Sequence, residues 1–125
     1  MPDKRLILIV DDEPDFVSLL QCRLEFEGYE VVSAGDGQDG FELLDARKPD
    51  IVILDLMMPV MDGFEFLSRR NVADERVRKI PVLIVTAFGA LMTDEQRKII
   101  ADVPVFHKPF EMVTLLKFMG ELIGK

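Results

Sequence analysis

The amino-acid sequence predicts an α/β fold with a doubly wound parallel sheet, that is, a sheet covered by helices on both faces. Two observations indicate this fold class. Five short runs rich in aliphatic and β-branched residues recur along the 125-residue chain, and each is as long as a strand. The segments between them are long enough for helices. Because regular alternation of strand and helix is typical of parallel sheets, we expect five strand–helix units.

The expected strands are runs in which apolar residues follow one another almost without interruption, as in strands that are buried on both faces. The run from Ile51 to Leu54, for example, contains no polar residue. The five runs are Leu6–Val10, Glu30–Ser33, Ile51–Leu54, Pro81–Val85 and Val103–Phe106.

The expected helices carry apolar residues at helical spacing. In the first helix, Phe16, Leu20 and Leu24 would lie on one face, and Gly28 would end the helix. The five expected helices span Asp15–Glu27, Gln38–Arg47, Gly63–Arg70, Thr93–Ala101 and Glu111–Ile123. The stretch 69–79 mixes basic and acidic residues, and we expect it to be a solvated loop.

Length and composition limit the classes of protein to which the chain can belong. A chain of 125 residues has the size of one domain, so we expect residues 1–125 to form a single domain. The net charge of −8, from 15 basic and 23 acidic residues, argues against direct binding of nucleic acid. No apolar run approaches the roughly 20 residues that span a bilayer, so we expect no membrane insertion and a cytoplasmic location. Cys22 is the single cysteine, which excludes an internal disulfide.

Polar residues with chemical potential follow four of the expected strands. Asp11 and Asp12 follow the first, Asp55 the third, Thr86 the fourth and Lys108 the fifth. The carboxyl ends of parallel strands meet at one edge of the sheet, where ligands of such folds bind. Taken singly, each residue has an ordinary structural explanation as a cap, a strand residue or a solvated charge. Their combination at one edge predicts a functional site.

The three carboxylates at this edge would repel one another unless a cation lies between them. Oxygen ligands without histidine or thiolate favour Mg²⁺, which usually keeps several waters and leaves room for a phosphoryl oxygen. The other polar groups then acquire roles. One carboxylate could attack phosphorus, while the ammonium of Lys108, the hydroxyl of Thr86 and backbone amides could hold the phosphoryl oxygens.

Four motifs resemble those of bacterial response-regulator receiver domains. They are VDDE at Val10–Glu13, ILDLMMPVMDGFE at Ile53–Glu65, VTA at Val85–Ala87 and KPF at Lys108–Phe110. The resemblance extends from Lys4 to about Ile123. It implies the flavodoxin-like fold, a (βα)5 arrangement with strand order 2-1-3-4-5.

The resemblance also implies a role for each matching acidic residue. Asp55 would be the phosphoacceptor. A magnesium ion would be bound directly by Asp12 and Asp55, mainly through water by Asp11, and by the backbone carbonyl of Met57.

The remaining site residues would hold the phosphoryl group. Thr86 and Lys108 would each contact one of its oxygens, and the backbone amides of Met57 and Ala87 would complete the cradle. The family further implies a cis peptide bond between Lys108 and Pro109.

The implied function is that of a signalling switch in a two-component phosphorelay. A sensor histidine kinase or a histidine phosphotransferase would donate a phosphoryl group to Asp55, and water would later remove it. The domain would assist both steps and is expected to be a switch, not a turnover enzyme. It would act by altered binding of a downstream protein, unknown from the sequence, or by forming a homodimer.

One position departs from the family pattern, and two other functions make different demands on the sequence. Receivers commonly have Tyr or Phe three residues before the lysine, where this chain has Val105. A magnesium-dependent phosphohydrolase with an aspartyl nucleophile would carry a second acid two residues after Asp55, where this chain has Met57. A receiver-like platform without phosphorylation would lack some of the polar residues, yet all are present.

Overall fold

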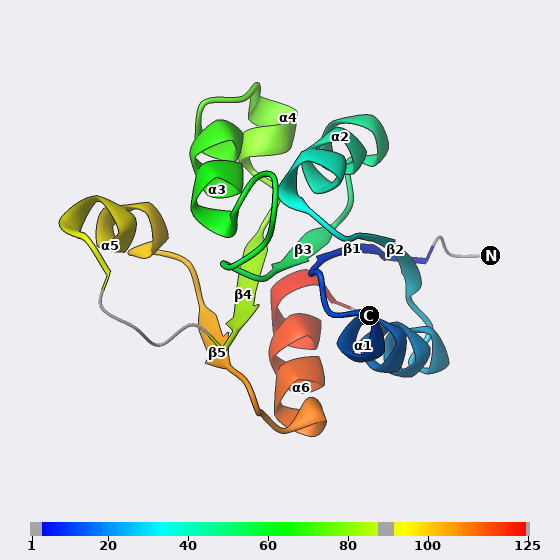
Figure 1. The fold of residues 1–125 in the computed structure, drawn as a ribbon. Coiled ribbons are helices and arrows are strands. Elements are labelled where there is room, and N and C mark those ends of the chain that lie inside the picture. The colour runs from blue at the N-terminus through cyan, green and yellow to red at the C-terminus, as the bar shows by residue number, and fades with distance from the viewer. Residues whose placement is uncertain (1–3, 88–91, 125) are drawn as a thin grey trace.

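The structure is a computed structural model that describes residues 4–87 and 92–124. Its centre is a five-stranded parallel sheet with the strand order β2-β1-β3-β4-β5, which confirms the expected order (Figure 1). The strands are β1 (Leu6–Val10), β2 (Glu30–Ala34), β3 (Ile51–Leu54), β4 (Val82–Thr86) and β5 (Val105–His107).

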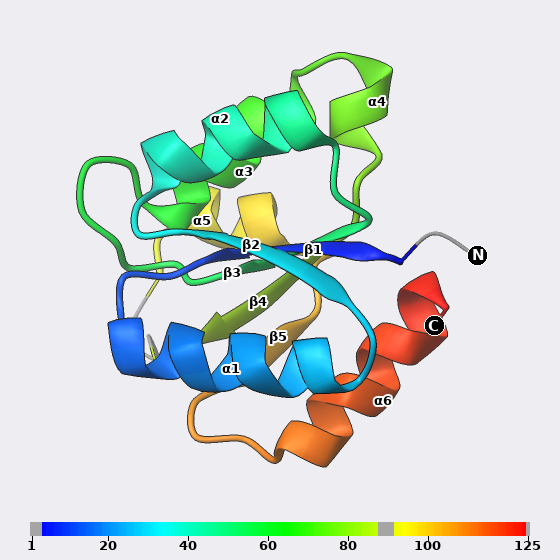
Figure 2. The ribbon, with the colours of Figure 1, turned by 90° about the vertical axis from the view of Figure 1, so that its right-hand side faces the viewer.

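Helices cover both faces of the sheet, as Figure 2 shows. One face carries α1 (Pro14–Phe26) and α6 (Met112–Ile123). The other carries α2 (Gly37–Arg47), α3 (Gly63–Asn71), the single turn α4 (Glu75–Arg78) and α5 (Asp94–Ile100). Within the described residues, no helix has the length and apolar character needed to cross a membrane.

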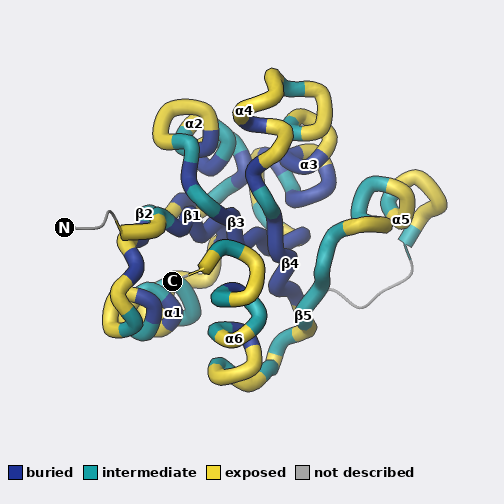
Figure 3. The backbone as a smooth tube through the Cα atoms, turned by 180° about the vertical axis from the view of Figure 1, so that it is seen from behind, coloured by how far each residue is buried: buried dark blue, intermediate teal, exposed yellow. Residues whose placement is uncertain are grey.

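Strand alternation divides the core into two layers. On the side of α2 and α3, Leu8, Leu54 and Ile84 pack with the buried residues of α3. On the side of α1 and α6, Ile9 and Ile53 pack with buried residues of these helices. In Figure 3 the central strands β1, β3 and β4 consist mainly of buried residues, whereas the helices carry many exposed ones. The sheet therefore fixes the positions of the residues that directly follow its strands.

Most elements lie within two residues of their expected bounds. Residues 69–79 are mostly exposed, as expected, but the expectation that they form a loop was wrong. Asp74 caps the short helix α4 by accepting a hydrogen bond from the backbone N–H of Val77, and Val77 is buried. Arg70 donates two hydrogen bonds to the carbonyl oxygen of Ile80, at 3.0 and 2.7 Å. Capping and the burial of one apolar side chain thus order a segment whose charges suggested a loop.

Candidate functional site

The polar residues expected at the strand ends do lie at one edge of the sheet. The backbone N–H of Asp55 donates to the carbonyl oxygen of Val10 at 2.9 Å, so the β1–β3 ladder continues to this residue. The backbone N–H of Lys108 donates to the carbonyl oxygen of Thr86 at 2.9 Å and extends the β4–β5 ladder in the same way. Sheet hydrogen bonds thus set the backbone positions of these residues.

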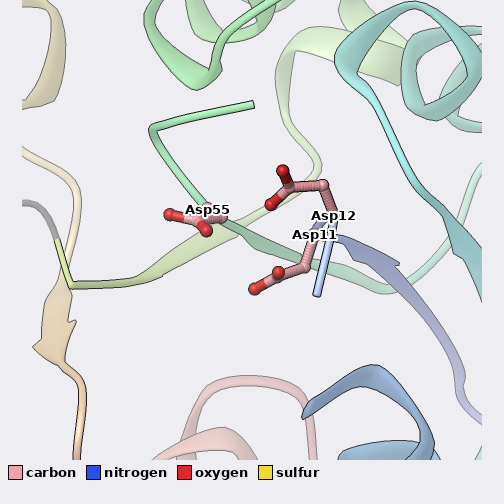
Figure 4. A group of neighbouring side chains, drawn as sticks. All are labelled: Asp11, Asp12 and Asp55. Atoms are coloured by element: carbon pink, nitrogen blue, oxygen red, sulfur yellow. The ribbon is translucent and has the colours of Figure 1, made fainter. Parts of the chain in front are cut away.

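Three carboxylates converge at this edge (Figure 4). Asp11, Asp12 and Asp55 each have an oxygen within 4.8 Å of an oxygen of the other two. Asp12 is exposed, whereas Asp11 and Asp55 are only 4% and 6% exposed. Burial, joined by the nearby charge of Asp55, raises the pKa of the Asp11 carboxyl, although hydrogen bonds from Lys108 and the Glu13 N–H oppose the rise. An all-oxygen cluster of like charges fits a hard divalent cation.

Lys108 balances part of this negative charge. Its Nζ lies 2.8 Å from Oδ2 of Asp11, 2.7 Å from Oε1 of Glu13 and 3.6 Å from Oδ2 of Asp55. Burial alone would lower the pKa of the ammonium, but the hydrogen bonds to Asp11 and Glu13 and the charges of the carboxylates outweigh it. The pKa of Lys108 therefore lies above its usual value, and the side chain is a cation at neutral pH.

Three donors or cations surround the Asp55 carboxylate. The hydroxyl of Thr86, which is fully buried, donates to Oδ1 at 2.7 Å. The backbone N–H of Met57 points to the same oxygen at 3.4 Å. With the ammonium of Lys108 near Oδ2, the carboxylate has positive or hydrogen-donating groups at both oxygens. Such groups stabilise negative charge that develops on an attached phosphoryl group.

The loop between Asp55 and α3 is tightly folded. The N–H of Gly63 donates to the carbonyl oxygen of Leu56 at 2.8 Å, and a Cβ atom at position 63 would lie 2.5 Å from the carbonyl oxygen of Asp55. Val60 has a positive φ of 67°, and the N–H of Met61 donates to the carbonyl oxygen of Pro59 at 2.7 Å. The chain therefore turns sharply at Val60 before α3 begins.

The two remaining residues of the expected cradle are also at this edge. The side chain of Met57 is exposed, and Ala87, which directly follows β4, is exposed beside Lys108. The peptide bond between Lys108 and Pro109 is cis, as expected. Val105 packs in the layer on the side of α2 and α3, whereas Phe106 packs in the opposite layer, so Phe106 does not replace an aromatic ring at position 105.

Sequence reasoning missed two contacts of Lys108. The sequence predicts Phe16 only as part of the apolar face of the first helix, and it assigns Glu13 no contact with Lys108. In the structure, Glu13 forms an ion pair with Lys108, and the ammonium lies 4.1 Å from the centroid of the Phe16 ring. The available signal was the three-residue spacing of Glu13 and Phe16, which places both side chains on one face at the start of the helix that follows the acidic pair.

An apolar hollow of about 460 Å³ adjoins Lys108 at the surface. Residues from the start of α1 and from the β5–α6 connection line it, including Phe16, Leu19, Pro109 and Met112. The side chain of Leu19 is 64% exposed. The site therefore opens beside an apolar surface.

Comparison with known proteins identifies the family. A sequence model described as the response regulator receiver domain matches residues 7–119. Sporulation initiation phosphotransferase F of Bacillus subtilis is 38% identical over 106 residues, which cover 85% of this chain and 83% of that protein. Protein PilH of Pseudomonas aeruginosa is 35% identical over 118 residues, which cover 94% and 97% of the two chains.

Some relatives are longer than this chain. The DNA-binding dual master transcriptional regulator RpaA of Synechocystis is 39% identical over 119 residues, which cover 95% of this chain and 49% of that protein. The chain thus spans about half the length of that curated relative. The similarity concerns the receiver portion.

Solved structures agree with the family match. Chemotaxis protein CheY4 of Vibrio cholerae has a TM-score of 0.83 and 28% identity, covering 96% of this chain and 99% of that one. The receiver domain of sensor histidine kinase PA1611 of Pseudomonas aeruginosa, described with a magnesium ion coordinated in its active site cleft, has a TM-score of 0.84 and 27% identity and covers 98% and 100%. The chain therefore belongs to the response regulator receiver domain family, the phosphoacceptor switches of two-component systems.

Proposed function

We propose that Asp55 is the phosphoacceptor of this receiver domain. The observation that carries the proposal is the environment of its carboxylate. Asp55 is buried at the end of β3, receives hydrogen bonds at Oδ1 from Thr86 and Met57, and lies 3.6 Å from the Lys108 ammonium at Oδ2. No other carboxylate within the described residues has the same three partners.

Mg²⁺ is the proposed cofactor. Asp11, Asp12, Asp55 and the backbone carbonyl of Met57 would hold it, with Asp11 acting mainly through water. The converging carboxylate oxygens support this assignment, because a cation would relieve the repulsion among them. The bound ion would neutralise charge between Asp55 and the incoming phosphoryl group.

The proposed reaction is in-line phosphoryl transfer from a phosphohistidine. An Asp55 oxygen forms a bond to phosphorus while the bond between phosphorus and the imidazole nitrogen breaks, and the nitrogen keeps the electron pair of that bond. Thr86, Lys108 and the amides of Met57 and Ala87 would hold the phosphoryl oxygens. Positioning and charge neutralisation supply most of the rate in such transfers, so the domain assists its own phosphorylation. Water later hydrolyses the acyl phosphate slowly.

The proposed phosphodonor is a sensor histidine kinase or a histidine phosphotransferase. The apolar hollow beside Lys108 supports this, because a protein that presents a histidine to Asp55 must cover the mouth of the site. We take residues 1–125 to act as one cytoplasmic receiver domain. Its output would be altered binding of a downstream protein or of a second copy.

The structure favours this function over a phosphohydrolase. Such an enzyme needs an acid two residues after the nucleophile to protonate the leaving group. Met57 occupies that position, and the nearby carboxylate of Asp11 is hydrogen-bonded to Lys108. A turnover enzyme would thus lack its proton donor.

The direct test is phosphorylation by acetyl phosphate in the presence of Mg²⁺, followed by intact-mass and peptide mass spectrometry. The wild-type protein should gain one phosphoryl group on the peptide that contains Asp55. Asp55→Asn should remain unmodified, because its amide cannot attack phosphorus. Asp45→Asn is the matched control, since Asp45 is an exposed helix residue paired with Lys48. It should be modified like the wild type.

Beryllofluoride, a mimic of the phosphoryl group, provides an independent readout. With Mg²⁺ it should bind the wild-type protein and Asp45→Asn but not Asp55→Asn, as measured by NMR shifts. A wild-type protein that neither accepts phosphate nor binds beryllofluoride would contradict the proposed function. Modification of Asp55→Asn would show that the phosphoacceptor is another residue.

A further inference from the structure

The Lys108 side chain lies against an aromatic ring as well as against carboxylates. Its ammonium is 4.1 Å from the centroid of the Phe16 ring, a cation–π distance. The Lys108 side chain is only 12% exposed, so water screens this contact weakly. The ring is therefore placed to hold the ammonium without occupying its N–H donors.

The start of α1 presents two groups to Lys108. Glu13 is the N-cap of α1 and Phe16 is the third residue of the helix, so they lie three positions apart, on the same face. Glu13 accepts a hydrogen bond from the ammonium at 2.7 Å, and Phe16 contacts it through the ring. The first turn of α1 thus provides an ionic contact and an aromatic contact to one cation.

Further aromatic rings form a packed series that begins at Phe16. Phe16 packs edge-on against Phe110 with centroids 6.0 Å apart, and Phe110 packs edge-on against Phe106 at 6.2 Å. Phe106 in turn contacts Phe118 of α6 at 5.5 Å. A chain of packed rings restricts the orientation of Phe16, because an edge-to-face pair loses its favourable geometry when one ring turns.

Positioning matters for Lys108 because its side chain is long and has several acidic partners. A flexible lysine can pair with Asp11 and Glu13 and turn away from Asp55, whose Oδ2 is already more distant at 3.6 Å. A ring that limits the positions of Nζ lowers the entropy lost when the ammonium binds a phosphoryl oxygen.

We propose that Phe16 is a positioning residue for Lys108, holding the ammonium over its ring at the mouth of the Asp55 site. This inference rests on the proposed function of that site. It adds an aromatic residue of α1, supported by Phe110, to the groups that prepare the domain for a phosphoryl group.

The first test examines the contact itself in the Mg²⁺-free protein by NMR. Protons on Cε of Lys108 should be shifted upfield by the ring current of Phe16. Phe16→Leu should abolish the upfield shift, while Phe41→Leu should retain it. Phe41 is the matched control because its ring makes an edge-on contact with Phe66, in the layer on the other side of the sheet.

The second test measures the affinity for beryllofluoride at saturating Mg²⁺. Phe16→Leu should weaken binding about five-fold, the effect expected from the loss of one cation–π contact. Phe16→Trp and Phe16→Tyr, which keep an aromatic face, should restore most of the affinity. Phe41→Leu should bind like the wild type.

Three outcomes would overturn the inference. They are an unshifted Lys108 signal in the wild type, equal beryllofluoride affinity of Phe16→Leu and wild type, and a loss of affinity in Phe41→Leu as large as that in Phe16→Leu. If Phe16→Leu does not fold, absence of the upfield shift in Phe16→Trp would also overturn the inference. If the wild-type protein does not bind beryllofluoride at all, the proposed function fails, and the NMR comparison in the Mg²⁺-free protein still decides the role of Phe16.

Discussion

Val60 holds a backbone conformation that β-branched residues rarely adopt. Its φ of 67° lies in the left-handed region, where the Cβ atom crowds the backbone. Its side chain is 81% exposed, so packing does not offset the cost. Val60 is the central residue of a turn that is closed by the hydrogen bond from the Met61 N–H to the Pro59 carbonyl oxygen, and this turn imposes the conformation. Strain is thus placed in the loop that follows the proposed phosphoacceptor.

Val60→Asn should stabilise the protein by about 1 kcal/mol, because asparagine tolerates positive φ better than valine does. The measurement is the free energy of unfolding from urea titration. Val72→Asn is the control, since Val72 is equally exposed but has a φ of −108°. It should change the free energy by less than about 0.5 kcal/mol. Equal effects of the two substitutions would show that the backbone at Val60 is not strained.

At the residue scale, the sequence predicted the polar groups of the site but not all of their contacts. Asp55 and Thr86 were predictable because strand ends can be read from apolar runs, and parallel strands place their ends together. The ring of Phe16 over Lys108 was not predictable, because it depends on how the first turn of α1 sits against the chain after β5. Helical spacing alone assigned Phe16 to the core.

Among the elements, the connection from β3 to α3 depends on a single glycine. Gly63 is the first residue of α3, and a Cβ atom there would come within 2.5 Å of the Asp55 carbonyl oxygen and 2.7 Å of the Leu56 Cα. Both obstacles are backbone atoms, which cannot turn aside. The helix can therefore approach the end of β3 this closely only with glycine at this position.

Gly63→Ala should destabilise the protein by about 2 kcal/mol and weaken beryllofluoride binding, because the backbone at Asp55 must shift to admit the methyl group. Urea unfolding and NMR titration measure the two effects. Gly120→Ala is the control: Gly120 lies within α6, and a Cβ there meets nothing within 4 Å. This control should gain up to about 1 kcal/mol from its higher helix propensity. Unchanged stability in Gly63→Ala would contradict the close approach.

The elements themselves were largely predictable, and the one wrong expectation is instructive. Strands β1 and β3 were found at their expected bounds because continuous apolar runs mark buried strands. Helix α4 has four residues, too few for an apolar period to be visible. Its order comes from the cap at Asp74 and from burial of Val77, and the second of these depends on the rest of the fold.

For the whole molecule, the acidic cluster couples stability to pH and to cations. The folded-state pKa of Asp11 lies above its ordinary value. The stability that this group contributes is therefore present at pH below that ordinary value and is lost as the pH rises through the folded pKa. At neutral pH the ionised carboxylate of Asp11 therefore opposes folding, and a divalent cation bound by the folded state should reverse the effect.

Mg²⁺ should raise the free energy of unfolding by about 2.7 kcal/mol at 100 times its dissociation constant. The gain should be smaller at mildly acidic pH than at neutral pH, because protonation of Asp11 competes with the metal. Urea titrations with and without Mg²⁺, at matched ionic strength, measure it. Asp11→Asn should be less responsive to Mg²⁺. A gain independent of pH and of Asp11 would indicate that the ion acts elsewhere.

The contact between Lys108 and Asp11 joins residues 97 positions apart in the chain. A polypeptide that is still being synthesised therefore has its acidic residues long before it has the lysine that balances them. The lysine can reach those acidic residues only when β1 and β5 lie in one sheet. The proposed site is therefore complete only after the last strand has docked.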